Sequence, residues 1–495
     1  MKRTLCLILA SLMAFTCISC SETASEDPAA APDDSSAVSA EEAAAAEEEP
    51  EGIPEPELPA KNYEGASFTT LTRGRYSGSF EEDYLIAEDL NGEPVNDAIY
   101  NRNIAVEEKF NLKTEFIENP DAAGEAQRLV MSSDNSVDVV DTQATSLSSL
   151  STGGCLINLL SLNHMNLAAD YWSENVMNDL QISDRLYLMT SDMSMARLEN
   201  TFFLYFNKVL LKDYNLEDIY TLVEEGKWTL SKYVEYITAV SSDLNGDGVF
   251  DRNDLFGSLY ENADILYYIV SCGIKLTERD DAKGLICTAY SEKTIDVVEK
   301  VKECFDSVST ISYMDVANGA DTSGYENLWE WARTLFAQRQ YLILPCGMFE
   351  LAELRDMEDD FGIAPMPKYD EAQEDYAHRI NAQGPAFAVP VSCGDTERAG
   401  IVMEYASWTS NQLLLPAYYE ITVKQKTIRD DKAVEMVDLI RRTARYEISE
   451  VYNLGISSVL NDAVANGDFA SKYTKQEKVI NKTIERLFQS IQELN

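Results

Sequence analysis

Two stretches of this sequence decide its fold: residues 95–117 read VNDAIYNRNIAVEEKFNLKTEFI, and residues 122–140 read AAGEAQRLVMSSDNSVDVV. In the first stretch, apolar residues recur about every four positions as far as Phe110, which predicts one face of a helix, and the rest alternates as a strand. The second stretch begins as a helix and ends in the β-branched strand Val137–Val140. Strands that alternate with helices of this length predict parallel βαβ units.

The same alternation continues on both sides of these stretches. Further strands are predicted at 67–71, 185–189, 201–206, 341–344, 361–364 and 386–391. Further helices are predicted at 209–213, 230–241, 398–409, 433–444 and 475–494. We therefore predict an α/β fold whose C-terminal third is mainly helical.

The charge of the chain excludes one class of partner. Its 495 residues include 85 Asp and Glu against 40 Lys and Arg, a net charge of −45. Phosphate backbones repel such a polyanion, so we expect no nucleic-acid binding. Apolar residues make up 45% of the chain, enough for a sizeable core, and the length allows two or three domains.

The N-terminus has the layout of a secretory signal. Lys2 and Arg3 precede the apolar run Thr4–Ile18, which is shorter than the ~20 residues of a spanning helix. Cleavage before Cys20 would leave a thiol for lipid attachment, as in a bacterial lipoprotein. We predict a signal peptide over 1–19 and lipidation at Cys20; plain secretion with a different cut is the alternative.

The segment that follows has the composition of a tether. Residues 21–60 hold 13 acidic residues, no basic ones and no aromatic ones. Such a segment cannot bury enough apolar surface to fold, so we predict a disordered acidic tether over 20–61. No later stretch is apolar enough to span a bilayer. The expected location is the outer face of the cytoplasmic membrane, held by the lipid anchor alone, in a Gram-positive anaerobe.

The remaining cysteines point to free thiols. They are widely spaced and contain no CxxC pair, and most have apolar or small neighbours. We expect buried free cysteines rather than disulfides at these positions. The six are Cys155, Cys272, Cys287, Cys304, Cys346 and Cys393.

Residues 243–254 form the strongest local motif, a calcium loop. Oxygen donors at this spacing wrap Ca²⁺, with Gly248 at the sharp turn and Phe250 anchoring the loop to a core. The predicted ligands are Asp243, Asn245, Asp247, the Val249 carbonyl, Asp251 and Asp254. The loop resembles those of dockerins, but it is single and internal, so we expect a structural ion.

Catalytic motifs are absent from the sequence. His164 and His378 lie far apart, and there is no HExxH, GxSxG, P-loop or GxGxxG. A carboxylate pair of the glycoside-hydrolase kind stays open because carboxylates are abundant, although no pair stands out. Aromatic residues could hold sugar rings, but for Trp329 and Trp331, in a predicted helix, we expect core packing.

Several ordered segments resemble the family 1 extracellular solute-binding proteins of ABC sugar importers, related to maltose-binding protein. The resemblance spans nearly all of residues 62–495, behind a lipoprotein-like signal. Its segments are Asp138-Val-Val-Asp141, Gly154-Cys-Leu-Ile-Asn-Leu, Leu204-Tyr-Phe-Asn207-Lys208, Gly226-Lys-Trp228-Thr229, Phe336-Ala-Gln-Arg-Gln-Tyr-Leu-Ile-Leu and Phe361-Gly-Ile-Ala-Pro365-Met-Pro367.

The resemblance implies a two-lobe periplasmic-binding-protein-like fold of type II, with hinge segments that cross between lobes and close on a solute. Lobe 1 would comprise 62–200 and 376–410, and lobe 2 would comprise 201–375 and 411–495. The solute would bind between the lobes, at the carboxyl ends of strands.

The family's ligand contacts, carried over by position, give nine candidates. Phe349 stands where the family often has an aromatic platform, usually Trp. The candidates are Arg73, Asp141, Thr142, Gln143, Glu199, Asn200, Tyr260, Glu261 and Phe349.

The function that the resemblance implies is capture of a carbohydrate, an oligosaccharide in our reading, and its delivery to the permease subunits of an ABC transporter. We expect a monomer without catalysis. The alternatives are a cell-surface carbohydrate-active enzyme and a dockerin-like surface interaction protein.

Overall fold

A computed structural model describes residues 53–74, 84–280, 284–325, 327–354, 357–420 and 431–494. The chain divides into Met1–Glu51 and Gly52–Asn495, and all described residues belong to the second unit. The predicted signal peptide, Cys20 and the tether up to residue 52 lie outside the described residues. No described helix is long and apolar enough to cross a membrane.

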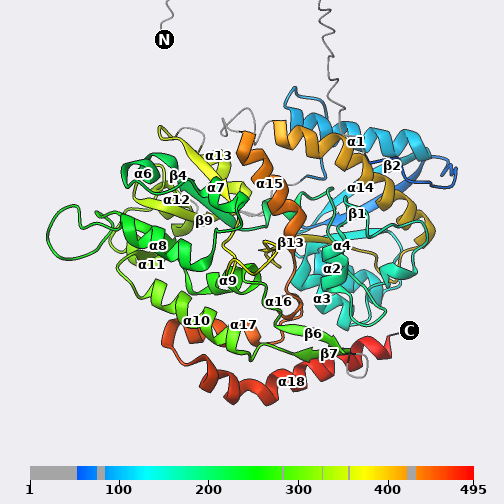
Figure 1. The fold of residues 1–495 in the computed structure, drawn as a ribbon. Coiled ribbons are helices and arrows are strands. Elements are labelled where there is room, and N and C mark those ends of the chain that lie inside the picture. The colour runs from blue at the N-terminus through cyan, green and yellow to red at the C-terminus, as the bar shows by residue number, and fades with distance from the viewer. Residues whose placement is uncertain are drawn as a thin grey trace, which may run out of the picture. The chain divides into compact units, whose positions relative to one another are not determined.

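The first lobe is built on a four-stranded sheet with the order β12-β3-β1-β2 (Figure 1). β1 runs parallel to β2 and β3, and β12 is antiparallel to β3. The strands are β1 (Ala66–Thr72), β2 (Leu112–Glu118), β3 (Val139–Gln143) and β12 (Pro385–Ala388). The accompanying helices are α1 (Pro94–Phe110), α2 (Ala122–Met131), α3 (Ala144–Thr152) and α14 (Thr396–Tyr418). The two quoted stretches thus form the predicted βαβ units.

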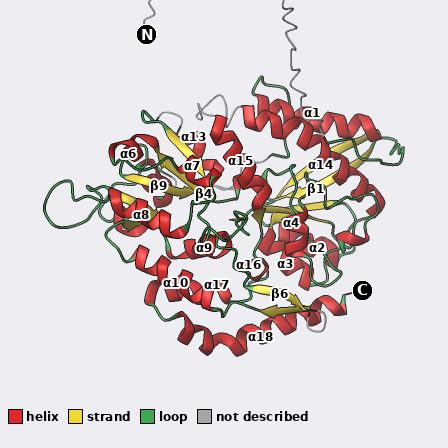
Figure 2. Cartoon of the chain, viewed as in Figure 1, coloured by secondary structure: helices red, strands yellow, loops and turns green. Residues whose placement is uncertain are grey.

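The second lobe is built on a five-stranded sheet with the order β10-β4-β9-β5-β8. Its strands are β4 (Phe203–Asn207), β5 (Phe256–Tyr260), β8 (Thr310–Ser312), β9 (Tyr341–Cys346) and β10 (Phe361–Ala364). Its helices are α6 (Lys208–Asp213), α7 (Ile219–Glu224), α8 (Leu230–Val240), α9 (Ile265–Ser271), α10 (Glu292–Phe305), α11 (Tyr313–Ala317), α12 (Leu328–Thr334), α13 (Leu351–Leu354) and α15 (Asp431–Thr443). Figure 2 shows the strands of each sheet enclosed by helices.

Two residues of the segments that resemble the solute-binding family, Asn207 and Trp228, make hydrogen bonds inside the second lobe. The Asn207 side chain caps α6 by accepting from the N–H groups of Val209 and Leu210, both at 2.9 Å. Trp228 is fully buried, and its indole N–H donates to the Pro365 carbonyl at 3.0 Å. These side chains therefore stabilise the second lobe.

Short segments beside one another connect the lobes. Thr201 and Ile380 form an isolated bridge, and the Asn381 N–H donates to the Asn200 carbonyl at 2.7 Å. The nearby strands β11 (His378–Arg379) and β13 (Ala444–Arg445) pair in parallel. The connecting and C-terminal elements are α4 (Glu174–Leu180), α5 (Ala196–Glu199), the hairpin β6 (Thr277–Asp280) and β7 (Gly284–Cys287), α16 (Ile448–Val451), α17 (Ile456–Asn466) and α18 (Phe469–Glu493). The exact lobe boundaries stay a prediction.

The structure differs from two of the local predictions. Residues 185–189 are not a strand: Met189 and Arg185 form only isolated bridges, and the Leu186 N–H bonds to the Asn158 side chain instead of a ladder. Residues 53–61, predicted as the end of the tether, contact the first lobe: the Trp408 indole N–H donates to the Ile53 carbonyl at 2.9 Å.

The six described cysteines are free, as predicted. Four of them are buried, and Cys287 and Cys393 are partly exposed.

Candidate functional site

A small pocket of about 20 Å³ lies at the carboxyl ends of β1 and β3. It brings together four of the predicted contact residues, because neighbouring parallel strands end at the same sheet edge. The lining residues are Thr72, Arg73, Gly74, Tyr84, Leu85, Asp141, Thr142, Gln143, Ser194 and Pro385.

Short hydrogen bonds fix the backbone beside this pocket. The Thr72 hydroxyl donates to the Asp141 carboxylate at 2.9 Å, and the Arg73 N–H donates to the Asp141 carbonyl at 3.1 Å. Gly74 has a φ of +72°, and a Cβ there would lie 2.8 Å from the Glu118 carboxylate, so the turn favours glycine. The loop that carries Arg73 is thereby held against β3.

Glu199 and Asn200 lie at the end of α5. Glu199 bonds to Tyr84, which is one of the residues that line this pocket. The buried Glu199 carboxylate accepts from the Tyr84 hydroxyl at 2.7 Å and from the Tyr418 hydroxyl. Burial, and secondarily the Glu199 charge, raises the pKa of Tyr418 well above its usual value, so this tyrosine stays a neutral donor.

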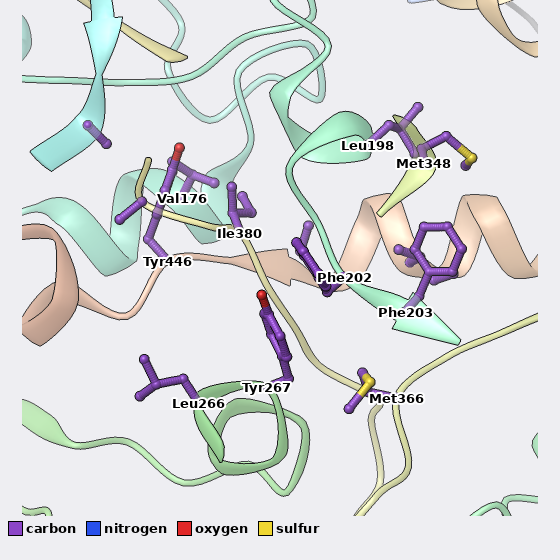
Figure 3. Packing of buried hydrophobic residues seen from close by; sticks show 14 of the residues in the cluster. Val176, Leu198, Phe202, Phe203, Leu266, Tyr267, Met348, Met366, Ile380 and Tyr446 are labelled. Carbon is purple, nitrogen blue, oxygen red and sulfur yellow. The ribbon is translucent and has the colours of Figure 1, made fainter. Parts of the chain in front are cut away.

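Phe349 follows β9, and the backbone just before it approaches the turn that carries Glu199. A Cβ at Gly347 would lie 2.9 Å from the Glu199 carbonyl oxygen, which means that the two backbones are nearly in contact. The half-buried Phe349 ring packs edge-on against Phe202, with centroids 6.0 Å apart. Phe202 in turn stacks on Tyr267 at 4.4 Å, and Figure 3 shows these two rings beside the connecting segment of Ile380.

Tyr260 ends β5, and Glu261, which follows it, bonds to a tryptophan of α12. The Trp329 indole N–H donates to the Glu261 carboxylate at 3.2 Å, and the Trp329 side chain is 41% exposed. Tyr260 is half-buried and stacks on Phe305 at 4.1 Å. The expectation that Trp329 packs in the core is therefore wrong, whereas Trp331 is partly buried against the core.

Helix α12 contacts both Glu261 and Phe349. Residues four apart on a helix lie on one face, and Trp329 and Arg333 are so spaced. The Arg333 guanidinium lies 5.4 Å from the centroid of the Phe349 ring and bonds to the buried Glu350 carboxylate at 2.5 Å. One helix face thus reaches both Glu261 and Phe349.

The structure therefore places the nine predicted residues in connected groups, and it adds residues that we did not predict: Tyr84, Ser194, Trp329, Arg333 and Tyr418. One signal was available for Trp329. In Trp329-Glu-Trp331 the two indoles are 200° apart around a helix, so they cannot both face one core. Tyr84 and Tyr418 carry no such signal, because each meets Glu199 only through tertiary packing.

The predicted calcium loop lies away from these groups and is bonded within itself. Asp243 accepts from the N–H groups of Gly246 at 2.6 Å and Gly248 at 2.8 Å. The fully buried Asp254 accepts from the N–H groups of Leu244 and Asp251, both at 2.9 Å. No group of three or more His, Cys, Asp or Glu side chains in the described residues is arranged to hold a metal ion. Calcium binding stays a prediction.

Comparison with solved structures identifies the fold. A sugar transporter from Rhizobium etli matches with a TM-score of 0.55 at 12% identity, over 87% of this chain and 100% of that one. The sugar-binding protein MalE from Xanthomonas citri matches with a TM-score of 0.54 at 12% identity, over 85% and 97%. An ABC substrate-binding protein from Listeria monocytogenes in complex with cycloalternan matches with a TM-score of 0.51 at 13% identity, over 85% and 99%.

No family model matches the sequence, and no curated protein matches it. At these identities the structural matches show the fold, and this chain has the two-lobe, periplasmic-binding-protein-like fold. That is the fold which the sequence resemblance implies.

Proposed function

We propose that the protein binds a carbohydrate, in our reading an oligosaccharide, between its lobes and delivers it to the permease of an ABC transporter. The observation that carries the proposal is the exposed Trp329 ring, held by Glu261, in a molecule whose other lobe presents the polar pocket around Arg73 and Asp141. Aromatic rings hold the C–H faces of sugars, and carboxylate, amide and guanidinium groups bond to their hydroxyls. Aromatic rings and such polar groups are both present among the candidate residues.

The two-lobe fold supports a binding role. A site divided between two lobes closes on its solute, which buries both faces of a flat sugar ring. The similar structures carry the names of sugar-binding and substrate-binding proteins, which favours binding over catalysis.

The Trp329→Ala variant tests the site. We expect isothermal titration against a panel of mono- and oligosaccharides to find a ligand for the parent, and the variant to bind that ligand about tenfold more weakly, on the order of the 1–3 kcal/mol that a planar base gains by stacking on an aromatic ring. Phe349→Ala should weaken binding as well. The matched control is Tyr290→Ala, which removes another exposed aromatic ring, 52% exposed, from outside the site.

Equal binding by Trp329→Ala and the parent would contradict the proposed contact. Absence of binding to every saccharide would contradict the carbohydrate assignment. Turnover of labelled glycans by the purified protein would instead favour the carbohydrate-active enzyme.

The lipid anchor is a separate part of the proposal. With Cys20 lipidated, the tether would hold the binding unit outside the membrane, and the unit would act there as a monomer. We expect Cys20→Ala to move the protein from the membrane fraction to the culture medium, as followed by immunoblotting, while Cys155→Ala, a buried cysteine, leaves it in the membrane fraction. Retention of Cys20→Ala in the membrane would contradict the anchor.

A further inference from the structure

A second, larger pocket of about 440 Å³ lies beside the segments that connect the lobes. It shares no lining residue with the pocket at the ends of β1 and β3. Its lining residues are Asn175, Asn178, Asp179, Gln181, Val270, Lys275, Thr277, Glu278, Arg279, Leu285, Arg445, Tyr446, Glu447 and Ile448. Its volume is within the range of small-molecule sites.

Three elements form the walls of this pocket, and they are bonded to one another. The Arg279 guanidinium on β6 donates to the Asn178 carbonyl on α4. Arg445 on β13 reaches the Asp179 carboxylate at 3.3 and 3.4 Å. The pocket is therefore lined mainly by α4, the β6–β7 hairpin and the segment from β13 to α16, which Figure 1 shows next to one another, together with Val270 of α9 and Lys275.

Its lining carries both signs of charge. Three cationic and three acidic side chains line it, and three amides complete the polar lining. Arg445 and Asp179 neutralise each other, and the buried Glu447 accepts from the Ser449 N–H at 3.2 Å and the Leu276 N–H at 3.4 Å. An anionic ligand would meet these carboxylates, and a cationic ligand would meet Lys275 and Arg279. A neutral molecule that both donates and accepts hydrogen bonds fits this lining.

Two buried hydroxyl groups in the walls have no bonding partner within the described residues. They belong to Thr277, 7% exposed, and Tyr446, 3% exposed. Figure 3 shows the Tyr446 hydroxyl directed toward Val176 of α4, next to the lining residue Asn175. Buried hydroxyls are nearly always bonded, and both of these hydroxyls are covered in the structure, so a molecule in this pocket would bond to them only after small shifts of the Thr277 and Tyr446 side chains.

We propose that this pocket is a second binding site, for a small neutral polyhydroxyl compound of the size of an inositol, a hexose or a disaccharide. Its amides and ion-paired side chains bond to the hydroxyls of the ligand, and small shifts of the Thr277 and Tyr446 side chains add two further bonds. The site does not depend on the saccharide site at α12.

The test compares the full-length protein with a Thr277→Val/Tyr446→Phe double variant, which removes both hydroxyls and keeps the side-chain shapes. The probes for isothermal titration are myo-inositol, glucose, trehalose and inorganic phosphate. The matched control is Tyr341→Phe, which removes a buried hydroxyl that also lacks a partner in the described residues but lies outside the pocket. We expect one neutral probe to bind, the double variant to bind it at least tenfold more weakly, and the control to bind it like the parent.

Folding of the double variant is checked by thermal denaturation without probe, where we expect a melting temperature no lower than that of the parent, because neither hydroxyl has a bonding partner within the described residues. Equal probe binding by parent and double variant overturns the proposal, as does binding of no neutral probe. Phosphate binding that the double variant weakens overturns the neutral class. A probe lost only in Trp329→Ala belongs to the other site, which supports the proposed function and overturns this one.

Discussion

Two buried titratable residues beside the connecting strands respond to pH in opposite directions. Burial lowers the pKa of His378 from 6.5 to about 3, and the Met366 N–H donates to its Nε2, so its neutral ring donates from Nδ1 to Thr443. Burial raises the pKa of Glu447 from 4.5 to about 7. Between pH 4.5 and 6.5 the unfolded chain binds a proton at His378 that the folded one does not, and the reverse holds at Glu447.

These pKa shifts make a signed prediction for stability. His378 makes stability fall as pH drops below 6.5, and Glu447 makes stability fall as pH rises above 4.5, each by up to about 1.4 kcal/mol per pH unit. In Glu447→Gln the second effect is removed. We therefore expect the free energy of unfolding of this variant, minus that of the parent, to increase from pH 4.5 to 7 in urea denaturation.

Taking this difference removes the contribution to the pH dependence from the many carboxylates that both proteins share. The control is Gln383→Ala, at an exposed position without a titratable group, whose difference from the parent should stay flat over the same range. Parallel curves for Glu447→Gln and the parent would contradict the raised pKa.

At the scale of elements, the calcium loop is the segment with the clearest testable role. It joins α8 to β5, and Phe250 packs edge-on against Phe256 of β5 with centroids 6.0 Å apart. An ion that gathers the loop oxygens would bind the folded protein only, and so stabilise it. We expect millimolar Ca²⁺ to raise the melting temperature of chelator-treated protein by several degrees, an order of magnitude set by about 2–3 kcal/mol of linkage.

Asp243→Asn should lose most of this increase, whereas Asp321→Asn, at an acidic position outside the loop, should keep it. The dockerin alternative makes a different prediction: chelation would release a captured partner in a pull-down assay. An unchanged melting temperature with Ca²⁺ would contradict an ion in this loop.

Local patterns predict the elements that bury one continuous apolar face. The helix of residues 94–110 belongs to this class, since the spacing of Ile99, Val106 and Phe110 predicts the face that is buried. The hairpin β6–β7 and the short pair β11–β13 were not predicted. β6, Thr277-Glu-Arg-Asp280, is short and polar, and the two residues of β11 find their partners in β13, which is distant in sequence.

The candidate site divides in the same way. Arg73 and Asp141 could be predicted together, because the carboxyl ends of adjacent parallel strands meet at one edge of a sheet; in the structure Asp141 lies within β3 and Arg73 directly follows β1. Tyr418 reaches Glu199 from the end of a 23-residue helix, and no local pattern encodes that meeting. Packing between distant segments also left Trp329 exposed.

At the scale of the whole molecule, one buried ion pair joins the segments that connect the lobes. Arg379 of β11 binds Glu450 of α16 through two hydrogen bonds, one of them at 2.7 Å, and both side chains are largely buried. The Arg379 guanidinium also lies 4.7 Å from the centroid of the Tyr267 ring. The pair therefore joins two of the connecting segments and contacts α9 of the second lobe, and its loss should weaken the connection between the lobes.

Replacing only one partner leaves the other charge buried, so we expect Arg379→Met to lower the free energy of unfolding by about 3–5 kcal/mol. The double variant Arg379→Met/Glu450→Leu should recover most of that loss, because no unpaired charge remains. The control is Lys227→Met at the exposed pair with Glu225, 51% and 47% exposed, where the change should stay within about 1 kcal/mol. Urea denaturation measures all three. If the double variant were no more stable than Arg379→Met, the two residues would not act as a pair, and the connection between the lobes would rest on the β11–β13 backbone instead.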